Sequence, residues 1–187
     1  QDEELWESRH LVLAPASGGV RRTRLSEIRN IRVSGMIAMK LDDGDSLIGV
    51  ATCRDGQDVF LATRKARCIR FQITDDTVRV FAGRGSSGVR GIRLAEGERV
   101  ISLAVLNHVE ATVEERAAYL RMANAKRRAE NAADTEDDAD VSVVDGDEDE
   151  GATGTEALTP ERFAQLEAAE EVLRIVCDCG FGGRYSD

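Results

Sequence analysis

Apolar and polar residues alternate in short runs over the first 108 residues of the chain, and glycine-containing turns separate these runs. Alternation with a period of two is typical of strands that bury one face. The predicted strands cover 10–14, 19–23, 36–41, 46–53, 58–63, 68–71, 89–94 and 99–105. Acid-glycine-acid triplets at 43–45 and 96–98 mark hairpin turns, because glycine accepts the positive φ that such turns need. The pattern therefore predicts an all-β fold.

The two halves of this region repeat one another. Residues 34–50 align with 87–103 at an offset of 53 residues, and 10–28 align with 58–76 at an offset of 48. A period of this size is in the range of propeller blades. Each repeat is therefore predicted to form one four-stranded blade that buries its apolar face on its neighbour.

The third strand of each repeat is predicted to alternate. One face of 36–41 is expected to carry Ile37, Met39 and Leu41, and the other Met36, Ala38 and Lys40. The second copy keeps this register and has Arg93 at the position of Lys40. The fourth strand is almost continuously apolar, as expected of a strand that is covered on both faces.

The pattern changes to helical after residue 108. Thr112 and Glu115 form a capping box before a predicted helix over about 112–133, and Thr159-Pro160 starts another over about 160–170. The acidic stretch between them, about 134–158, is poor in large apolar residues and is predicted to be disordered. The predicted parts are a lead-in from a preceding blade at 1–9, blade repeats at 10–57 and 58–108, an insertion at 109–170, and the start of the next blade at 171–187.

Charge is distributed unevenly along the chain. The formal net charge is -10, but residues 1–108 hold 17 Lys and Arg against 14 Asp and Glu, whereas 109–187 hold 8 against 21. The repeats are therefore mildly basic and the acidity belongs to the insertion. No run of about 18 uncharged apolar residues occurs, so neither a transmembrane helix nor a membrane partner is expected. The charged first ten residues do not resemble a signal peptide.

Metal binding and catalysis find little support in the sequence. The four cysteines lack paired CxxC spacing and are Cys53, Cys68, Cys177 and Cys179. Reduced cysteines in a cytoplasmic protein are the expectation. Neither Tyr119 nor Tyr185 has a neighbouring base in view, so no catalytic residue is expected. The first residue is Gln1 and not Met, which suggests a piece of a longer protein.

Basic residues gather in the second strand of each repeat, in the loop after it and in the third strand. They are Arg21, Arg22, Arg24, Arg29, Arg32, Arg64, Lys65, Arg67, Arg70, Arg79 and Arg84, followed by Lys40, Arg90 and Arg93 in the third strands. Arg22 aligns with Arg70, which predicts a basic stripe along a shared rim. Such a stripe can follow a phosphate backbone. The alternative, that these arginines only solvate exposed strand faces as charge usually does, stays equally open at this point. Because the sequence has neither an aromatic ladder nor a recognition helix, a bound nucleic acid would be a duplex held by its backbone and shape, with little sequence preference.

The repeats closely resemble the C-terminal β-pinwheel domain of DNA gyrase A subunits. The segments that carry the resemblance are GGVRRTRLSE (18–27), GMIAMKLDDGD (35–45), DVFLATRKARCIRF (58–71), GRGSSGVRGIRLAEGERVISL (83–103) and GFGGR (180–184). The resemblance implies a six-bladed propeller-like ring around which duplex DNA wraps. This chain would supply two four-stranded blades and the start of a third, interrupted by a helical, partly disordered acidic insertion.

The resemblance also implies a function. Gyrase is a type II topoisomerase that joins A and gyrase B subunits as A2B2 and introduces negative supercoils at the expense of ATP. The cleaving tyrosine, ATP and Mg are expected in other parts of that enzyme, so no cofactor is expected in this stretch. The candidate DNA phosphate contacts are Arg21, Arg22, Arg24, Arg64, Lys65, Arg70, Arg84, Arg90 and Arg93.

Some positions depart from the family pattern. The glutamine-arginine-glycine box of the family is not in this stretch. Lys65-Ala66-Arg67 replaces a turn that usually contains glycine, so that turn is expected to be either strained or reshaped. The acidic insertion is expected either to compete with DNA phosphate or to be a passive linker. Two alternatives stay open: the corresponding C-terminal domain of topoisomerase IV, which decatenates DNA, and a propeller that binds proteins.

Overall fold

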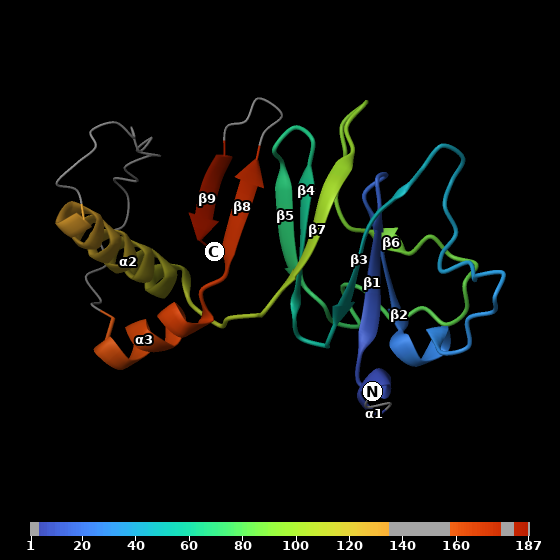
Figure 1. The fold of residues 1–187 in the computed structure, drawn as a ribbon, viewed down its shortest axis with the longest axis horizontal. Coiled ribbons are helices and arrows are strands. Elements are labelled where there is room, and N and C mark those ends of the chain that lie inside the picture. Colours follow the sequence, from blue (N-terminus) through green and yellow to red (C-terminus); the bar gives the residue numbers. More distant parts are fainter. Residues whose placement is uncertain (1–3, 135–157, 177–181, 187) are drawn as a thin grey trace. The chain divides into compact units, whose positions relative to one another are not determined.

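The computed structural model describes residues 4–134, 158–176 and 182–186, and the chain divides into two compact units (Figure 1). Unit 1 is Gln1–His108 and unit 2 is Val109–Asp187. The described part of unit 1 is built from strands, apart from α1 (Glu4–Glu7) and the short 3-10 helix η1 (Leu25–Ile28). The prediction of an all-β fold is confirmed for this unit. The six-bladed ring was expected of a whole domain with more blades than this chain contributes, and it stays a prediction.

The first sheet of unit 1 has four antiparallel strands in the order β3-β1-β2-β6. Its strands are β1 (His10–Pro15), β2 (Gly19–Arg24), β3 (Leu47–Cys53) and β6 (Val89–Arg90). The turn between β1 and β2 places Gly18 at φ +86°, in the left-handed region where glycine is favoured. The predicted glycine turn at this position is therefore present.

The second sheet has the order β5-β4-β7, with β4 (Asp58–Thr63), β5 (Cys68–Gln72) and β7 (Val100–Leu106). His10 pairs with Arg24 in the first sheet, and Asp58 pairs with Gln72 in the second, which reproduces the offset of 48 residues. His10 also pairs with Cys53, and Asp58 with Leu106, which reproduces the offset of 53. The alignment of the repeats in sequence is thus an alignment of strand register.

The predicted third strands are wrong in both repeats. Residues 36–41 form no strand, and of 89–94 only Val89–Arg90 does. The expected alternation over 36–41 also fails, because Ile37 is 72% exposed while Met39 is buried. β6 pairs with β2 in the sheet of the first repeat, so the first four-stranded sheet takes strands from both repeats. Residues 36–41 pair with neither sheet, although β5 is an edge strand with a single partner, so the alternating pattern alone does not make a strand.

The two sheets of unit 1 share one core. Val12 and Ala14 from β1 and Val59 and Leu61 from β4 belong to the same buried cluster. At the offset of 48, Val59 and Leu61 correspond to Leu11 and Leu13, which lie on the opposite face of β1. Opposite faces of equivalent strands therefore meet, as in stacked blades. The approach is close at Gly49, where an added Cβ would lie 2.8 Å from Leu103 Cβ.

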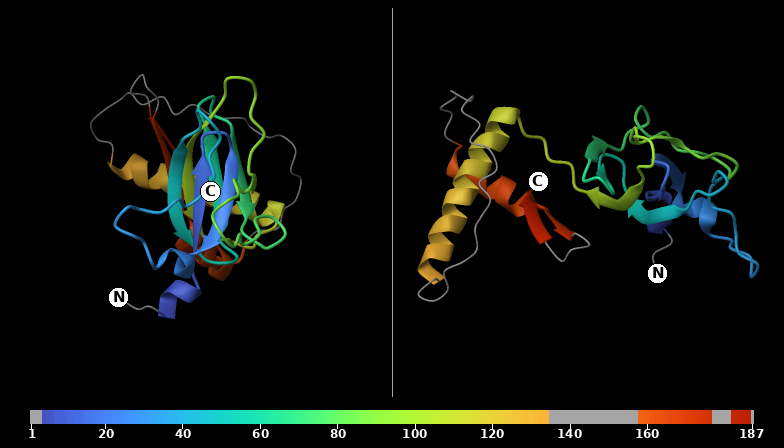
Figure 2. Two further views of the ribbon diagram at one scale, coloured as in Figure 1. Left: turned by 90° about the vertical axis from the view of Figure 1, so that its right-hand side faces the viewer. Right: turned by 90° about the horizontal axis from the view of Figure 1, so that it is seen from above.

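The described part of unit 2 forms two helices and a two-stranded sheet (Figure 2). They are α2 (Val113–Asp134), α3 (Pro160–Ala169), β8 (Val172–Val176) and β9 (Gly182–Ser186). Thr112 and Glu115 exchange the two hydrogen bonds of a capping box, at 3.0 and 3.1 Å. The predicted disordered stretch at about 134–158 lies almost entirely outside the described residues.

Packing and ion pairs hold α2 against α3. Tyr119, Ala123 and Leu166 form a small buried cluster, in which the rings of Tyr119 and Phe163 lie 5.2 Å apart. Arg162 Nε donates to Glu115 Oε1 at 3.0 Å, and this contact helps to lower the pKa of Glu115. Within the described ranges, no helix has the length and apolar composition needed to cross a bilayer.

Candidate nucleic-acid interface

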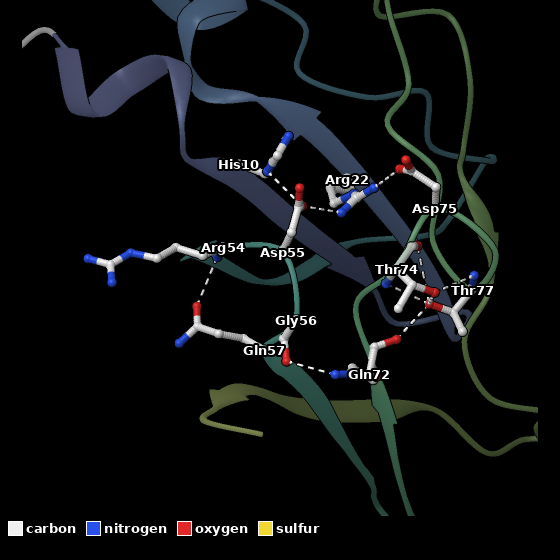
Figure 3. Close-up of polar contacts among 10 residues, drawn as sticks. All are labelled: His10, Arg22, Arg54, Asp55, Gly56, Gln57, Gln72, Thr74, Asp75 and Thr77. Carbon is white, nitrogen blue, oxygen red and sulfur yellow. Dashed lines mark hydrogen bonds and ion pairs between the residues drawn. The ribbon is translucent and has the colours of Figure 1, made fainter. Parts of the chain in front are cut away.

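Arg22 is buried inside unit 1, where its guanidinium group is held by acids from two loops (Figure 3). Nη1 donates to Asp55 Oδ1 at 2.6 Å, in the link between β3 and β4, and Nη2 donates to Asp75, in the loop after β5. The side chain is 1% exposed, whereas both carboxylates are largely exposed. The expectation that Arg22 lies on an exposed rim is wrong, because the side chain is buried and paired with Asp55 from the first repeat and Asp75 from the second.

His10 completes this cluster at the start of β1. Its Nδ1 lies 3.4 Å from Asp55 Oδ1, and Figure 3 shows both Arg22 and His10 directed at the same carboxylate. Burial is the largest effect on His10 and lowers its pKa, with Asp55 acting in the opposite direction. His10 is therefore a neutral, buried neighbour of the arginine at pH 7.

Arg70 occupies the equivalent position on β5 and also has internal partners. Its Nε donates to Asp58 Oδ2 at 2.7 Å, and Nη2 donates to the carbonyl of Asn107 at 3.3 Å. His108 Nδ1 lies 3.0 Å from the other oxygen of Asp58. Arg70 is half-buried and engaged, so a phosphate contact from it would compete with these bonds.

Arg21 is fully buried too, but its acceptors are different. Nη1 donates to the carbonyl of Ser86 at 3.0 Å and to Ser86 Oγ, and Nη2 donates to the carbonyl of Gly83. Its guanidinium carbon lies 5.3 Å from the centre of the Phe81 ring, and that of Arg79 lies 4.6 Å from it. The prediction that Arg21 is at the surface is wrong. Arg79, which the nine candidates omitted, is an exposed basic residue that packs on Phe81.

The other six candidates are exposed. They are Arg24 at the end of β2, Arg64 and Lys65 in the turn between β4 and β5, Arg84 in the loop at 83–88, Arg90 in β6 and Arg93 after it. Exposure leaves these side chains accessible to an anion. Their contact with DNA stays a prediction.

Two open hollows bring basic residues of both repeats together. A groove of about 950 Å³ is lined by Arg32, Lys40 and Arg84, together with Met36, Ile37, Met39 and Leu41. A smaller hollow of about 400 Å³ is lined by Lys40 and Arg90, together with Asp42 and Asp45. Lys40 lines both, so the structure relates Arg84 to Arg90 through it. The alignment of Lys40 with Arg93 in the two repeats identified Lys40 as a recurring basic position. It did not predict that Arg32, Arg84 and Arg90 line the same hollows.

The turn with Lys65-Ala66-Arg67 has the expected strain. Ala66 adopts φ +60°, and among the described residues other than glycine it alone has a positive φ. Its position is that of Gly18 in the first repeat, at the offset of 48. Arg67 Nη1 donates to Glu98 at 3.1 Å, and Glu98 also accepts from Thr63 Oγ1 at 2.6 Å.

Catalytic features are not evident in the described part of the chain. It contains no group of three or more His, Cys, Asp or Glu residues that could hold a metal ion. Burial raises the pKa of the Cys53 thiol to about 11, and burial together with Glu170 raises the pKa of Tyr119. Neither group is activated as a nucleophile, since activation requires a lowered pKa or an adjacent base.

Comparison with known proteins gives consistent results. The family described as "DNA gyrase C-terminal domain, beta-propeller" matches residues 10–54 and 57–107. The chain is 62% identical to the DNA gyrase A protein of Granulibacter bethesdensis over 186 residues, which is 100% of this chain and 20% of that protein. It spans about a fifth of the length of the curated relatives that it matches.

Two solved structures are also similar. The C-terminal domain of DNA topoisomerase IV has a TM-score of 0.49 and 22% identity, over 54% of this chain and 31% of that chain. The DNA gyrase A C-terminal domain has a TM-score of 0.47 and 26% identity, over 54% of this chain and 32% of that chain.

Proposed function

Because the chain belongs to the family of DNA gyrase C-terminal β-propeller domains, we propose that it binds duplex DNA and wraps it in the negative supercoiling reaction of a DNA gyrase. Wrapping requires a surface that follows the phosphate backbone, and the charge of that surface supplies most of the affinity. The acidic net charge of the chain does not oppose this function, because the acid is concentrated outside the repeats.

The observation that supports this proposal most is the position of Lys40 between two hollows. Arg32 and Lys40 come from the first repeat, and Arg84 and Arg90 from the second, yet they line two hollows that share Lys40. Basic side chains that converge from separate segments neutralise neighbouring phosphates without reading the bases. The expected binding is therefore tight at low salt and nearly independent of sequence.

In this proposal the chain acts within a larger assembly. Its partners are duplex DNA and the gyrase B subunit in an A2B2 complex, in the cytoplasm and on the chromosome. ATP, Mg²⁺ and the tyrosine that cleaves DNA belong to other parts of that enzyme. The chain supplies the wrapping surface and leaves the cleavage to those parts.

A matched pair of charge-reversal variants of the full-length protein tests the proposal. Lys40→Glu with Arg84→Glu should weaken binding to linear duplex DNA and reduce the slope of log K against log salt by about 1.8, at about 0.9 per lost phosphate contact. Arg54→Glu with Arg116→Glu changes the net charge equally at exposed residues outside the hollows and should leave the slope nearly unchanged.

Wrapping is measured separately by ligating nicked circles on the full-length protein and reading the shift in linking number. The wild type should shift it, and the Lys40/Arg84 variant should not. A wild type whose DNA affinity does not depend on salt would rule out the proposal and favour a protein-binding propeller. Strong decatenation without a shift in linking number would favour the topoisomerase IV alternative.

A further inference from the structure

The loop at 83–88 is fixed to unit 1 from the inside by Arg21. This fully buried side chain gives its hydrogen bonds to the Gly83 carbonyl and to both oxygens of Ser86, at the two ends of a short stretch that contains Arg84. Arg84 itself is exposed. The buried Arg21 therefore holds the loop that carries the exposed Arg84.

Burial of an arginine among carbonyl groups alone is energetically unfavourable. Removing a guanidinium group from water costs several kcal/mol, and carboxylate partners are the usual compensation. Arg22, the next residue, has two such partners, whereas the hydrogen bonds of Arg21 go to the loop and its Nε has no acceptor in the described part of the chain. The face of Phe81 supplies a further, weaker attraction.

The rest of the loop is fixed as well. At Gly88, φ is +95° and an added Cβ would lie 2.3 Å from the carbonyl oxygen of Val20, so the chain passes directly over β2. The Ser86 carbonyl also accepts from the backbone N–H of Lys40 at 3.3 Å. Arg21 thus fixes a loop that in turn supports Lys40, the residue shared by both hollows.

Peptide geometry determines which groups this arrangement directs outward. In a trans peptide the C=O and the following N–H point in opposite directions, and the described chain has no cis peptide. Because the carbonyls of Gly83 and Ser86 point at Arg21, the N–H groups of Arg84 and Ser87 point away from it. Neither N–H has an acceptor among the described residues. Backbone N–H groups beside an arginine are common ligands of DNA phosphate.

We propose that Arg21 is a positioning residue for DNA, which holds the loop at 83–88 so that the Arg84 side chain and the N–H groups of Arg84 and Ser87 bind one backbone phosphate. This inference rests on the proposed function. It assigns to Arg21 an action through Arg84 in place of a direct contact, and it makes the two residues one functional unit.

A double-mutant cycle on the full-length protein tests this unit. Arg84→Ala should weaken binding to duplex DNA about fivefold to tenfold at 0.1 M salt and lower the salt slope by about 0.9. Arg21→Lys keeps the charge but cannot bridge two carbonyls with one planar group, so it should lower the slope by the same amount. The double variant should bind no more weakly than either single variant.

Arg22→Lys is the matched control, because Arg22 is also buried in β2 but its guanidinium group donates to Asp55 and Asp75 and not to the loop. Its effect on DNA binding should be small and should add to that of Arg84→Ala. If the effects of Arg21→Lys and Arg84→Ala are additive, the inference is overturned, while the proposed function stands as long as the wild type binds DNA in a salt-dependent way. Thermal melting shows whether each variant is folded.

Ser86→Ala decides the question if Arg21→Lys does not fold. This substitution removes one acceptor of Arg21 and leaves β2 intact. It should lower the salt slope in part and should make the further loss from Arg84→Ala smaller than in the wild type. The inference would be overturned if a folded Ser86→Ala protein had the salt slope of the wild type and if Arg84→Ala reduced that slope as much in this variant as in the wild type.

Discussion

Each repeat contains a cluster of one histidine, one arginine and one aspartate, but the histidine and the aspartate occupy exchanged positions in the two repeats. The first contains His10, Arg22 and Asp55, and the second contains Asp58, Arg70 and His108. The offset of 48 relates His10 to Asp58 and Arg22 to Arg70, and the offset of 53 relates Asp55 to His108. The histidine and the aspartate have therefore exchanged places around an arginine that both repeats keep.

The exchange changes which member of the cluster is buried. In the first repeat Arg22 is 1% exposed and its carboxylate partners reach solvent, whereas in the second the Asp58 side chain is 4% exposed and Arg70 is 26% exposed. Removing a partner of a buried charge is costly, and removing a buried charge whose partners are solvated is not. Depth of burial therefore does not predict which arginine matters more for stability.

The largest expected effect follows directly from this difference. Arg70→Met should lower the free energy of unfolding by about 3 kcal/mol, because it removes the arginine partner of the buried Asp58 carboxylate and leaves it beside His108. Arg22→Met should cost about 1 kcal/mol or less, since Asp55 and Asp75 return to water. Urea unfolding followed by fluorescence of Trp6, the one tryptophan of the chain, measures both. A larger loss for Arg22→Met would contradict the comparison.

The turn between the first two strands of each repeat gives the next effect. Gly18→Ala should cost about 2 kcal/mol, because the left-handed conformation is unfavourable for alanine and the new Cβ would lie 3.0 Å from Ile92. Gly35→Ala is the control, with φ +81° but nothing within 4 Å, and should cost only about 1 kcal/mol. Equal losses in urea unfolding would show that contact with the second repeat is unimportant at Gly18.

The exchanged pair can be reversed in the first repeat. His10→Asp alone places two acids side by side next to Arg22 and should be destabilising. Adding Asp55→His recreates the arrangement of the second repeat and should recover about 1 kcal/mol relative to the sum of the single changes. The coupling is read from the four unfolding curves of the cycle. Simple additivity would mean that the two clusters are similar only in composition.

The first cluster should also respond to pH through His10. Burial lowers its folded pKa below the usual 6.5, so the unfolded chain binds the proton more readily. The stability from neutral His10 is complete above pH 6.5 and is lost as the pH falls through the folded pKa, by less than about 1.4 kcal/mol per pH unit. His10→Gln should flatten urea midpoints between pH 7.5 and 5, and an unchanged pH profile would contradict this assignment.

The smallest expected effect is a gain. Ala66→Gly gives the second repeat the glycine that the first has at Gly18 and should raise stability by about 0.5 kcal/mol. Relief of the left-handed alanine exceeds the entropy that glycine loses on folding. Because Ala66 is exposed, the substitution removes little packing. A loss of stability would show that the turn relaxes to another conformation in solution.

Local patterns in the sequence were sufficient for six of the eight predicted strands. Alternation and glycine turns belong to neighbouring residues, so strands such as β1 and β4 lie where they were expected. The failure at 36–41 and 89–94 has a non-local cause, because pairing depends on which edge is free, and β6 uses the edge of β2 in the other repeat.

The burial of the basic residues could not be predicted from the sequence either. Alignment identified Arg22 and Arg70 as equivalent, but Asp55 and Asp75, which enclose Arg22, are 33 and 53 residues away along the chain. The sequence shows which residues are charged, but it does not determine how deeply their side chains are buried. The same limit applies to Arg21, whose acceptors are two backbone carbonyls and one serine hydroxyl of the loop at 83–88, and no acidic residue in that loop marks them in the sequence as its partners.

The position of β6 also sets an order of events during synthesis. The first three strands of the first sheet are complete once Cys53 has left the ribosome, but the edge of β2 stays open until Val89–Arg90 follows. An open edge with unpaired N–H and C=O groups is a site for misassembly between nascent chains. A pause in translation between residues 53 and 90 would therefore lengthen the period in which neighbouring polypeptides on one messenger RNA can pair wrongly.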